Sequence, residues 1–207
     1  MIIDYATLQT EIASWISRED LTDTIPTFIQ LNEADLSRNL RVPDMEVRAS
    51  PLASSGAISL PSDCRSVKSL KNVVTTTSYM PALEYVGPEE FENFKVAQIT
   101  GQPVRYYTII GNYVPMLPAP QDGTAFNLSY WQTIPALSDT NTSNWLLVKS
   151  PELYLYGSIL QAVVFGFEDE RVPLLQAAKQ KIMDDMDLEG SRYSRPQTQL
   201  TAQRRAF

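Results

Sequence analysis

Three clusters of acidic residues have the types and spacing that metal-binding or acid–base chemistry would need. They lie at residues 89–92 (EEFE), 168–170 (EDE) and 184–187 (DDMD). Paired carboxylates could hold magnesium, or act as a general acid and a general base. Acidic residues are also favoured near helix N-termini and on solvated helix faces. We favour this second interpretation and keep a metal-dependent hydrolase as an alternative.

The sequence contains no histidine. Histidine is the commonest general base, the usual partner of a serine or cysteine nucleophile, and the commonest metal ligand. Phosphate-binding glycine motifs and the G-x-S-x-G motif are also absent from the sequence. The single cysteine, Cys64, excludes an intramolecular disulfide and fits a protein made in a reducing cytoplasm. We therefore expect no catalytic residue, no cofactor and no metal site.

Aromatic residues gather in the middle of the sequence, at Tyr106, Tyr107, Tyr113, Tyr130 and Trp131. Together they could form a stacking platform, which would make the protein a carbohydrate- or peptide-binding β module on a helical base. Strand alternation offers a simpler explanation, because one residue of each adjacent pair then points into the core. We favour packing and keep the ligand-binding module as the alternative function.

Residues 191–207 contain four arginines and no acidic residue. The whole chain has a formal net charge of −7, so the rest of it carries −11. Few apolar side chains accompany the arginines, and we expect an extended arm. We favour a partner-docking role, with non-functional decoration and nucleic-acid contact as alternatives. The expected docking residues are Arg192, Tyr193, Arg195, Leu200, Arg204, Arg205 and Phe207.

The overall composition indicates a folded, acidic protein. Hydrophobic residues make up 43% of the chain, which supports a substantial core. The pI near 4.7 argues against a generic nucleic-acid binder, since such proteins are usually basic. Residues 1–4 lack the basic region and apolar run of a signal peptide, and no transmembrane segment is apparent.

A buried helix is predicted to begin at Ser150, an N-cap residue followed by Pro151 and Glu152. From there to about Phe167 the sequence is apolar on nearly all sides, which is typical of a helix enclosed by other helices. Its length of about 25 Å is too short to cross a membrane. The expected core of this helical domain is Trp145, Leu153, Tyr156, Leu160, Val163 and Val164.

Three further helices are predicted from apolar residues at helical spacing. The first runs from an Asp4 cap to about Ser17, and the second from about Thr24 to before residues 42–43. The last is capped by Asp169 and ends at Gly190.

The middle of the chain is predicted to be a β domain. Short β-branched or alternating stretches lie at residues 46–49, 57–60, 65–70, 82–86, 104–110, 113–117 and 124–131, with a short helix at 88–94. Gly111 and Asn112 predict a two-residue hairpin turn in which both positions tolerate positive φ. Pro115 is expected on an edge strand or at a bulge.

These elements predict an α+β fold. Residues 1–45 and 136–190 should form a four-helix bundle-like domain, and residues 46–135 an inserted antiparallel β domain. Residues 191–207 should extend as the C-terminal arm.

Several short stretches, in one order and spacing, carry a resemblance to a known family. They are residues 25–34 (IPTFIQLNEA) with 38–41 (RNLR), 60–63 (LPSD), 83–91 (LEYVGPEEF), 101–107 (GQPVRYY), 117–120 (LPAP), 130–131 (YW) with 134–137 (IPAL), and 144–147 (NWLL) with 153–157 (LYLYG). Through them the sequence resembles the head-to-tail adaptor (connector) proteins of tailed bacteriophages over about residues 24–170. The residues after Gly190 contain none of these stretches.

The resemblance implies a structural virion protein at the neck, made in the host cytoplasm and not associated with a membrane. Such adaptors form a ring, usually of twelve subunits, beneath the portal protein. The ring extends the DNA channel and carries tail or nozzle proteins, so the implied partners are the portal, a downstream tail protein and further copies of the chain. DNA should pass without specific binding, because an acidic lumen repels phosphate. C-terminal segments of related adaptors often grip the portal, which is the role expected for the arm.

Overall fold

The computed structural model describes residues 1–73, 82–96, 103–163 and 170–194, in two compact units. The helical unit comprises Met1–Met45 and Ile134–Phe207, and the β unit comprises Glu46–Thr133. The expected division placed the return of the chain after residue 135. The chain returns earlier because Ile134 is buried in the helical unit and its N–H donates to the Ser37 hydroxyl at 3.2 Å.

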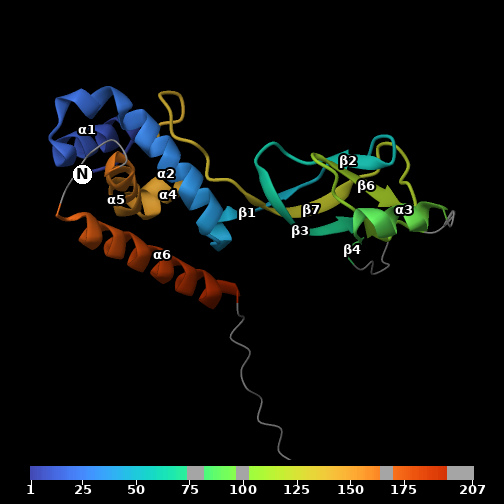
Figure 1. Ribbon diagram of the computed structural model, residues 1–207. Helices are drawn as coiled ribbons and strands as arrows, with labels where there is room; N and C mark the ends of the chain where they lie inside the picture. The colour runs from blue at the N-terminus through green and yellow to red at the C-terminus, as the bar shows by residue number, and fades with distance from the viewer. Residues whose placement is uncertain (74–81, 97–102, 164–169, 195–207) are drawn as a thin grey trace, which may run out of the picture. The chain divides into compact units, whose positions relative to one another are not determined.

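The helical unit contains more elements than the four predicted helices. They are α1 (Tyr5–Ile16), the 3-10 helix η1 (Glu19–Thr24), α2 (Ile25–Asn39), the 3-10 helix η2 (Pro43–Met45), α4 (Trp145–Lys149), α5 (Pro151–Ala162) and α6 (Val172–Ser194). Helix α5 contacts α1, α2, α4 and α6 (Figure 1). The sequence pattern predicted only a polar link over residues 18–23, whereas η1 occupies most of this stretch and buries the side chain of Leu21.

Capping side chains define where α1 and α4 begin. Asp4 accepts a hydrogen bond of 2.8 Å from the Thr7 N–H, and the Thr7 hydroxyl accepts one from the Asp4 N–H, which completes a capping box. Asn144 caps α4 by accepting from the Leu147 N–H at 2.8 Å. Ser150 stands at the N-cap of α5, but its hydroxyl makes no cap bond and points to the Met186 sulfur instead.

The predicted core of the helical unit needs one correction. Leu153 is fully buried, whereas Trp145, Tyr156 and Leu160 are partly buried. Val163 is 37% exposed and does not belong to the core, because it follows the last turn of α5 and lines an open groove. Val164 lies outside the described residues.

Helix α6 does not end at Gly190, as the sequence suggests, but continues to Ser194. Gly190 is buried, and a β-carbon at this position would lie 2.7 Å from Cδ of Pro43. The glycine therefore permits close packing of α6 against η2 and does not stop the helix. Two residues of the expected arm, Arg192 and Tyr193, belong to this last turn. The predicted cap Asp169 and the arm residues Arg195, Leu200, Arg204, Arg205 and Phe207 lie outside the described residues.

The β unit contains two sheets around one core. One has the order β1 (Glu46–Ala49), β7 (Phe126–Gln132), β3 (Cys64–Asn72), and the other β2 (Ala57–Ser59), β6 (Tyr113–Leu117), β5 (Tyr106–Tyr107), β4 (Glu84–Tyr85). The core between them includes Ile58, Leu70, Val114, Met116, Phe126 and Leu128.

The strand pairing is antiparallel as predicted, except that β4 and β5 are parallel. Parallel neighbours need a long crossover connection. Helix α3 (Pro88–Val96) lies within this connection. The sequence pattern predicted this helix, but it did not predict that the strands before and after the helix pair in parallel.

The hairpin turn after residue 110 forms as predicted, with reciprocal backbone hydrogen bonds between Ile110 and Tyr113. Gly111 has a φ of +62°, whereas Asn112 does not have a positive φ. Positive φ at the first position alone is the pattern of a type II′ turn.

The expected position of Pro115 is wrong, because it lies on β6, an interior strand between β2 and β5. Its ladder contact with β5 is made by its carbonyl, which accepts from the Thr108 N–H at 3.1 Å. Thr108 follows the last residue of β5, so the missing N–H falls where this ladder ends.

Candidate interaction surfaces

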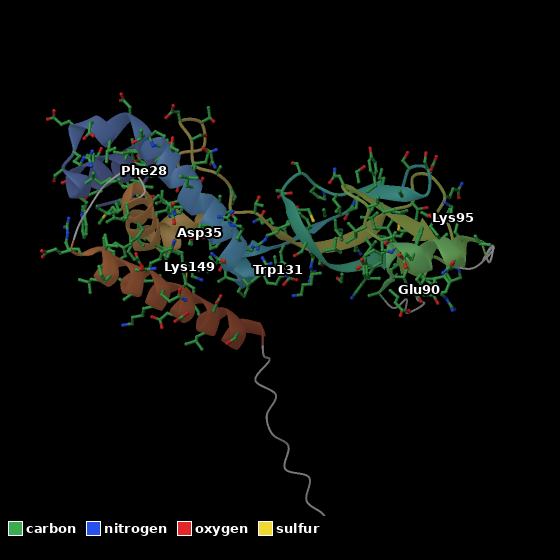
Figure 2. All side chains as sticks on the ribbon, viewed as in Figure 1. Phe28, Asp35, Glu90, Lys95, Trp131 and Lys149 are labelled. Carbon is green, nitrogen blue, oxygen red and sulfur yellow. The ribbon has the colours of Figure 1, made fainter. Side chains whose placement is uncertain are left out.

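The acidic clusters do not assemble a metal site in the part of the chain that the structure describes, where no group of three or more potential ligands converges. Glu89 and Glu90 occupy the first turn of α3, and Lys95 lies in its last turn (Figure 2 labels Glu90 and Lys95). Residues 168 and 169 of the second cluster lie outside the described residues. The carboxylates of Asp184 and Asp185 are exposed on α6. These positions agree with helix-terminus and solvated-face roles.

The aromatic residues of the middle region do not form a common platform. Tyr106, Tyr107 and Tyr113 belong to one sheet, whereas Tyr130 and Trp131 belong to the other. Tyr107 and Tyr130 are buried in the core of the β unit, as strand alternation predicted.

The remaining aromatic side chains have separate neighbours. The ring of Tyr106 lies 4.9 Å from the Phe94 ring, and Lys68 Nζ lies 5.4 Å from the centre of the Trp131 ring. Tyr113 is the exposed member, at 63%. A stacking surface built from all of these residues is therefore not present.

A buried polar network joins the returning chain to α2 and α5. Glu33 Oε1 accepts from the Leu137 N–H at 2.9 Å and from the Tyr154 hydroxyl at 3.0 Å. Asn144 Nδ2 donates to the Tyr154 hydroxyl and to the Pro135 carbonyl, both at 2.7 Å. Burial raises the pKa of Glu33, and the two hydrogen bonds that its carboxylate accepts oppose this rise.

The same network could be mistaken for an acid–base site, since it holds a carboxyl group with a raised pKa. Its polar groups bond to one another, and Tyr154 and Asn144 are buried. Burial also raises the pKa of Tyr154, with the Glu33 charge as the second cause. The network therefore has a structural role, in which buried hydrogen bonds hold α2, α5 and the returning chain together. Sequence patterns did not indicate it because its members are far apart in the chain.

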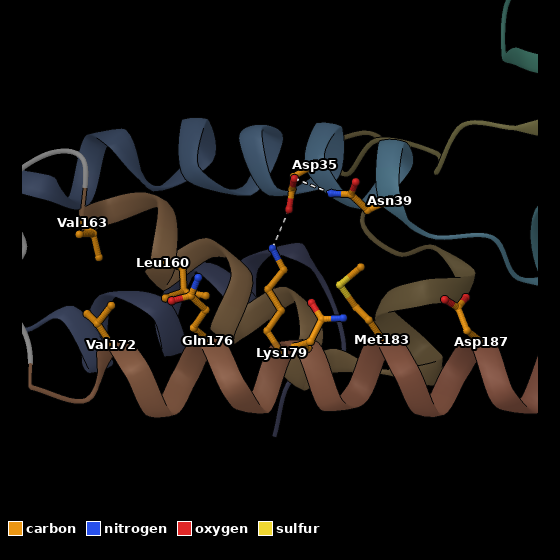
Figure 3. A pocket seen from close by; sticks show the side chains of 10 residues that line it. Asp35, Asn39, Leu160, Val163, Val172, Gln176, Lys179, Met183 and Asp187 are labelled. Carbon is orange, nitrogen blue, oxygen red and sulfur yellow. Dashed lines mark hydrogen bonds and ion pairs between the residues drawn. The ribbon is translucent and has the colours of Figure 1, made fainter.

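A groove of about 720 Å³ lies between α2, α5 and α6 (Figure 3). Its lining consists of Asp35, Asn39, Leu160, Val163, Val172, Gln176, Lys179, Gln180, Met183 and Asp187. Val163, Val172 and Leu160 gather at one end, and Met183 and Asp187 lie toward the other (Figure 3).

One ion pair crosses this groove. Lys179 Nζ lies 2.8 Å from Asp35 Oδ2, and Asn39 Nδ2 donates to Asp35 Oδ1 at 2.8 Å. Lys179 is on α6 and Asp35 is on α2, so the ion pair links these two helices across the groove.

A second surface lies on the β unit, where three large apolar side chains are exposed. Ile110 and Tyr113 flank the hairpin turn, and Leu52 borders the same cavity as Tyr113. This cavity measures about 440 Å³, and none of its lining residues is charged: Pro51, Leu52, Ser54, Ser55, Ala57, Ser59 and Tyr113. Contiguous exposed apolar groups are typical of protein-binding surfaces.

A third feature is an ion-pair junction at the end of α6. Lys149 Nζ lies 3.1 Å from Asp44 Oδ2 and 3.2 Å from Glu189 Oε2 (Figure 2 labels Lys149). It links α4, η2 and α6 beside the close contact of Gly190 with Pro43. The junction connects the C-terminal part of α6 to α4 and η2.

The sequence profile of the SU10 adaptor protein family matches residues 3–201 of the chain, and this match includes both units. The chain belongs to the SU10 adaptor protein family. Membership confirms the resemblance to phage head-to-tail adaptors and makes the protein a structural virion component. No curated protein matches the chain.

The surfaces described above are candidates for contacts with other proteins. The adaptor family is associated in general with portal and tail proteins. Among the described helices of this adaptor, none is long and apolar enough to span a membrane.

Proposed function

We propose that this adaptor forms a ring of about twelve subunits beneath the portal, extends the DNA channel and carries tail or nozzle proteins. The observation that carries the proposal is the family match over residues 3–201. No catalytic step is part of the proposal.

Ring formation requires heterologous contacts, in which one surface of a subunit meets a different surface of the next. The uncharged apolar surface of Leu52, Ile110 and Tyr113 has the character of one such contact. Aromatic side chains such as Tyr113, when they are buried near the centre of an interface, commonly contribute a large share of its binding energy.

The charge distribution supports passage of DNA without specific binding. The chain outside residues 191–207 carries −11. A channel wall of this sign repels phosphate and does not retain it.

The arginine-containing end of the chain is proposed to dock onto the portal. It comprises the last turn of α6, with Arg192 and Tyr193, and the segment 195–207. The ion-pair junction around Lys149 anchors its base. Each subunit of a ring presents one such segment, so repeated weak contacts add to a high overall affinity.

The proposal is tested by mixing the full chain with purified portal rings and measuring stoichiometry by native mass spectrometry. We expect a complex with a fixed number of adaptor subunits for each portal ring. A variant ending at Ser194 should bind at least tenfold more weakly. If this variant bound the portal as tightly as the full chain, the docking role of the segment would be refuted. If the full chain formed no complex with portal rings, the proposed function would be refuted.

The alternative function, a carbohydrate- or peptide-binding module, has one observation in its favour. The cavity beside Tyr113 is uncharged and large enough for a side chain or a sugar ring. Screening the full chain against glycans and peptides, with Tyr113→Ala as control, tests it. Specific binding that this variant loses would favour the alternative.

A further inference from the structure

The groove between α2, α5 and α6 has the dimensions and chemistry of a binding site for an extended peptide. We propose that it binds the chain's own residues 200–207, so that the free subunit holds its portal-docking segment against its helical unit. The contact between the segment and the groove is inferred from the geometry and chemistry of the groove. Only the link between this contact and portal docking rests on the proposed function.

The length of the groove matches this segment. From Val172 to Asp187 the α6 wall is about 22 Å long, because an α-helix rises about 1.5 Å per residue. An extended chain from Leu200 to Phe207 spans about 23 Å, at about 3.3 Å per residue. The two large apolar residues of the segment, Leu200 and Phe207, are thus separated by about the distance between the two ends of the groove.

The side chains along the groove also complement those of the segment when Phe207 is placed at the Val172 end. Leu160, Val163 and Val172 form an apolar end that suits the ring of Phe207. Arg204 lies three residues before Phe207, about 10 Å in an extended chain. This is also the distance along α6 from Val172 to the level of the Lys179–Asp35 ion pair. The Asp35 carboxylate already bonds to Lys179 and Asn39, and its two oxygens retain further lone pairs that can accept from a guanidinium.

The other end of the groove suits the beginning of the segment. Met183 lines the groove at the level proposed for Leu200, although only 8% of this residue is exposed, and Asp187 adds a second carboxylate. Residues 195–207 contain three arginines and no acid, whereas the lining contains two aspartates and one lysine. Gln176 and Gln180 can donate to and accept from a peptide backbone, as an extended ligand requires.

The chain connection permits binding within one molecule. From Ser194 back to the level of Asp187 is about 10 Å along α6, and residues 195–199 can span about 16 Å when extended. The segment would then run antiparallel to α6. A short tether gives a high effective concentration, which favours a subunit's own groove over that of a neighbour.

The proposed contact makes portal docking and groove binding exclusive. A segment that occupies the groove presents neither Phe207 nor Arg204 to another protein. Portal binding must therefore draw the segment out, which keeps free subunits from presenting it to other acidic surfaces.

A photo-cross-linking experiment on the full chain, without portal, tests the contact. Phe207 is replaced by p-benzoylphenylalanine, and the dilute protein is irradiated and mapped by mass spectrometry. We expect a product of monomer mass with a link from position 207 to residues near Val163, Val172 or Gln176. A product of dimer mass would show binding to a second copy and would overturn the proposal, as would a link outside the groove or no link.

Two matched variants separate groove binding from folding. Gln176 and Ala177 are adjacent and exposed on α6, but only Gln176 lines the groove. Gln176→Arg should reduce the cross-link at least fivefold, since it places a positive charge where the arginines approach, whereas Ala177→Arg should leave it unchanged. Equal cross-linking in both variants, with unchanged melting temperatures, would contradict the proposal. This assay contains no portal. A failure of the groove proposal can therefore be distinguished from a failure of the proposed function.

Discussion

Gly157 on α5 lies directly against the side chain of Asn32 on α2. A β-carbon at position 157 would overlap the carboxamide of Asn32, and both residues are buried. Asn32 Nδ2 lies 3.5 Å from the carbonyl oxygens of Leu153 and Tyr154. This pair therefore sets how closely α2 and α5 approach.

Replacing Gly157 with alanine should destabilise the helical unit. Overpacking of a buried site costs about 1–3 kcal/mol, and occasionally more. Because the added β-carbon would overlap three atoms of the Asn32 carboxamide, we expect a cost near the upper end, above the roughly 1 kcal/mol that alanine gains over glycine in a helix. Chemical denaturation measures the change. Gly87→Ala is the control, since nothing lies within 4 Å of its added β-carbon. An unchanged midpoint for Gly157→Ala would show that the close approach is not required.

Removing the buried carboxylate should have opposite effects according to its replacement. Glu33→Ala leaves the Leu137 N–H and the Tyr154 hydroxyl without their acceptor, and should cost about 1–3 kcal/mol for each buried group left without a partner. Glu33→Gln keeps an acceptor oxygen and removes the charge, so this variant should be at least as stable as the native chain at pH 7. Chemical denaturation measures both variants. If Glu33→Ala were as stable as Glu33→Gln, the proposed contribution of the network to stability would be refuted.

The same residue should give the native chain a distinct pH dependence. Burial raises the pKa of Glu33, so the folded state binds its proton more tightly than the unfolded state. Its contribution to stability is complete below the unfolded pKa of about 4.3, and it is lost as the pH rises through the folded pKa. The free energy of unfolding of the native chain minus that of Glu33→Gln should therefore fall as pH rises from 4 to 7. A constant difference would contradict the assigned pKa shift.

Aspartate substitutions at two positions of α5 should distinguish a buried core residue from a residue that lines the open groove. Leu153 is fully buried, and Leu153→Asp should prevent folding because it buries a charge without a partner. Val163→Asp should be tolerated within about 1 kcal/mol, since this side chain is already 37% exposed. Circular dichroism melting distinguishes them. Loss of the transition in both variants would mean that Val163 is covered in the folded protein.

The Tyr130 hydroxyl of the β unit donates to Asp63 at 3.1 Å. Burial and this hydrogen bond raise the pKa of Tyr130 to about 12. In an alkaline absorbance titration, Tyr130→Phe should therefore remove the tyrosine that ionises near pH 12 and leave the ordinary phenols unchanged. It should also destabilise the β unit by about 1 kcal/mol. Loss of an ordinary phenol instead would place Tyr130 in water.

Local patterns predicted the elements better than their ends. The capping chemistry of Asp4 and the hairpin at Gly111 are each encoded within a few residues, and both were found as predicted. Gly190 was misread because its role depends on Pro43, far away in the sequence. A glycine that ends a helix and one that permits close packing have the same local pattern.

The candidate surfaces were the least predictable part. The groove combines Asp35 of α2 with Val163 of α5 and Lys179 of α6, and no spacing within the sequence relates them. The network of Glu33 likewise depends on Tyr154 and Asn144 meeting in the fold. The family was indicated instead by the order of the short sequence stretches, and the match over residues 3–201 then confirmed it.

Imaging of the assembled phage particle tests the central claim most directly. Electron microscopy of particles carrying an adaptor with a small tag on the exposed α3 helix would locate the protein. The account predicts tag density in a single ring at one capsid vertex, between portal and tail. Density elsewhere in the capsid, or particles with complete tails and no tag, would contradict it.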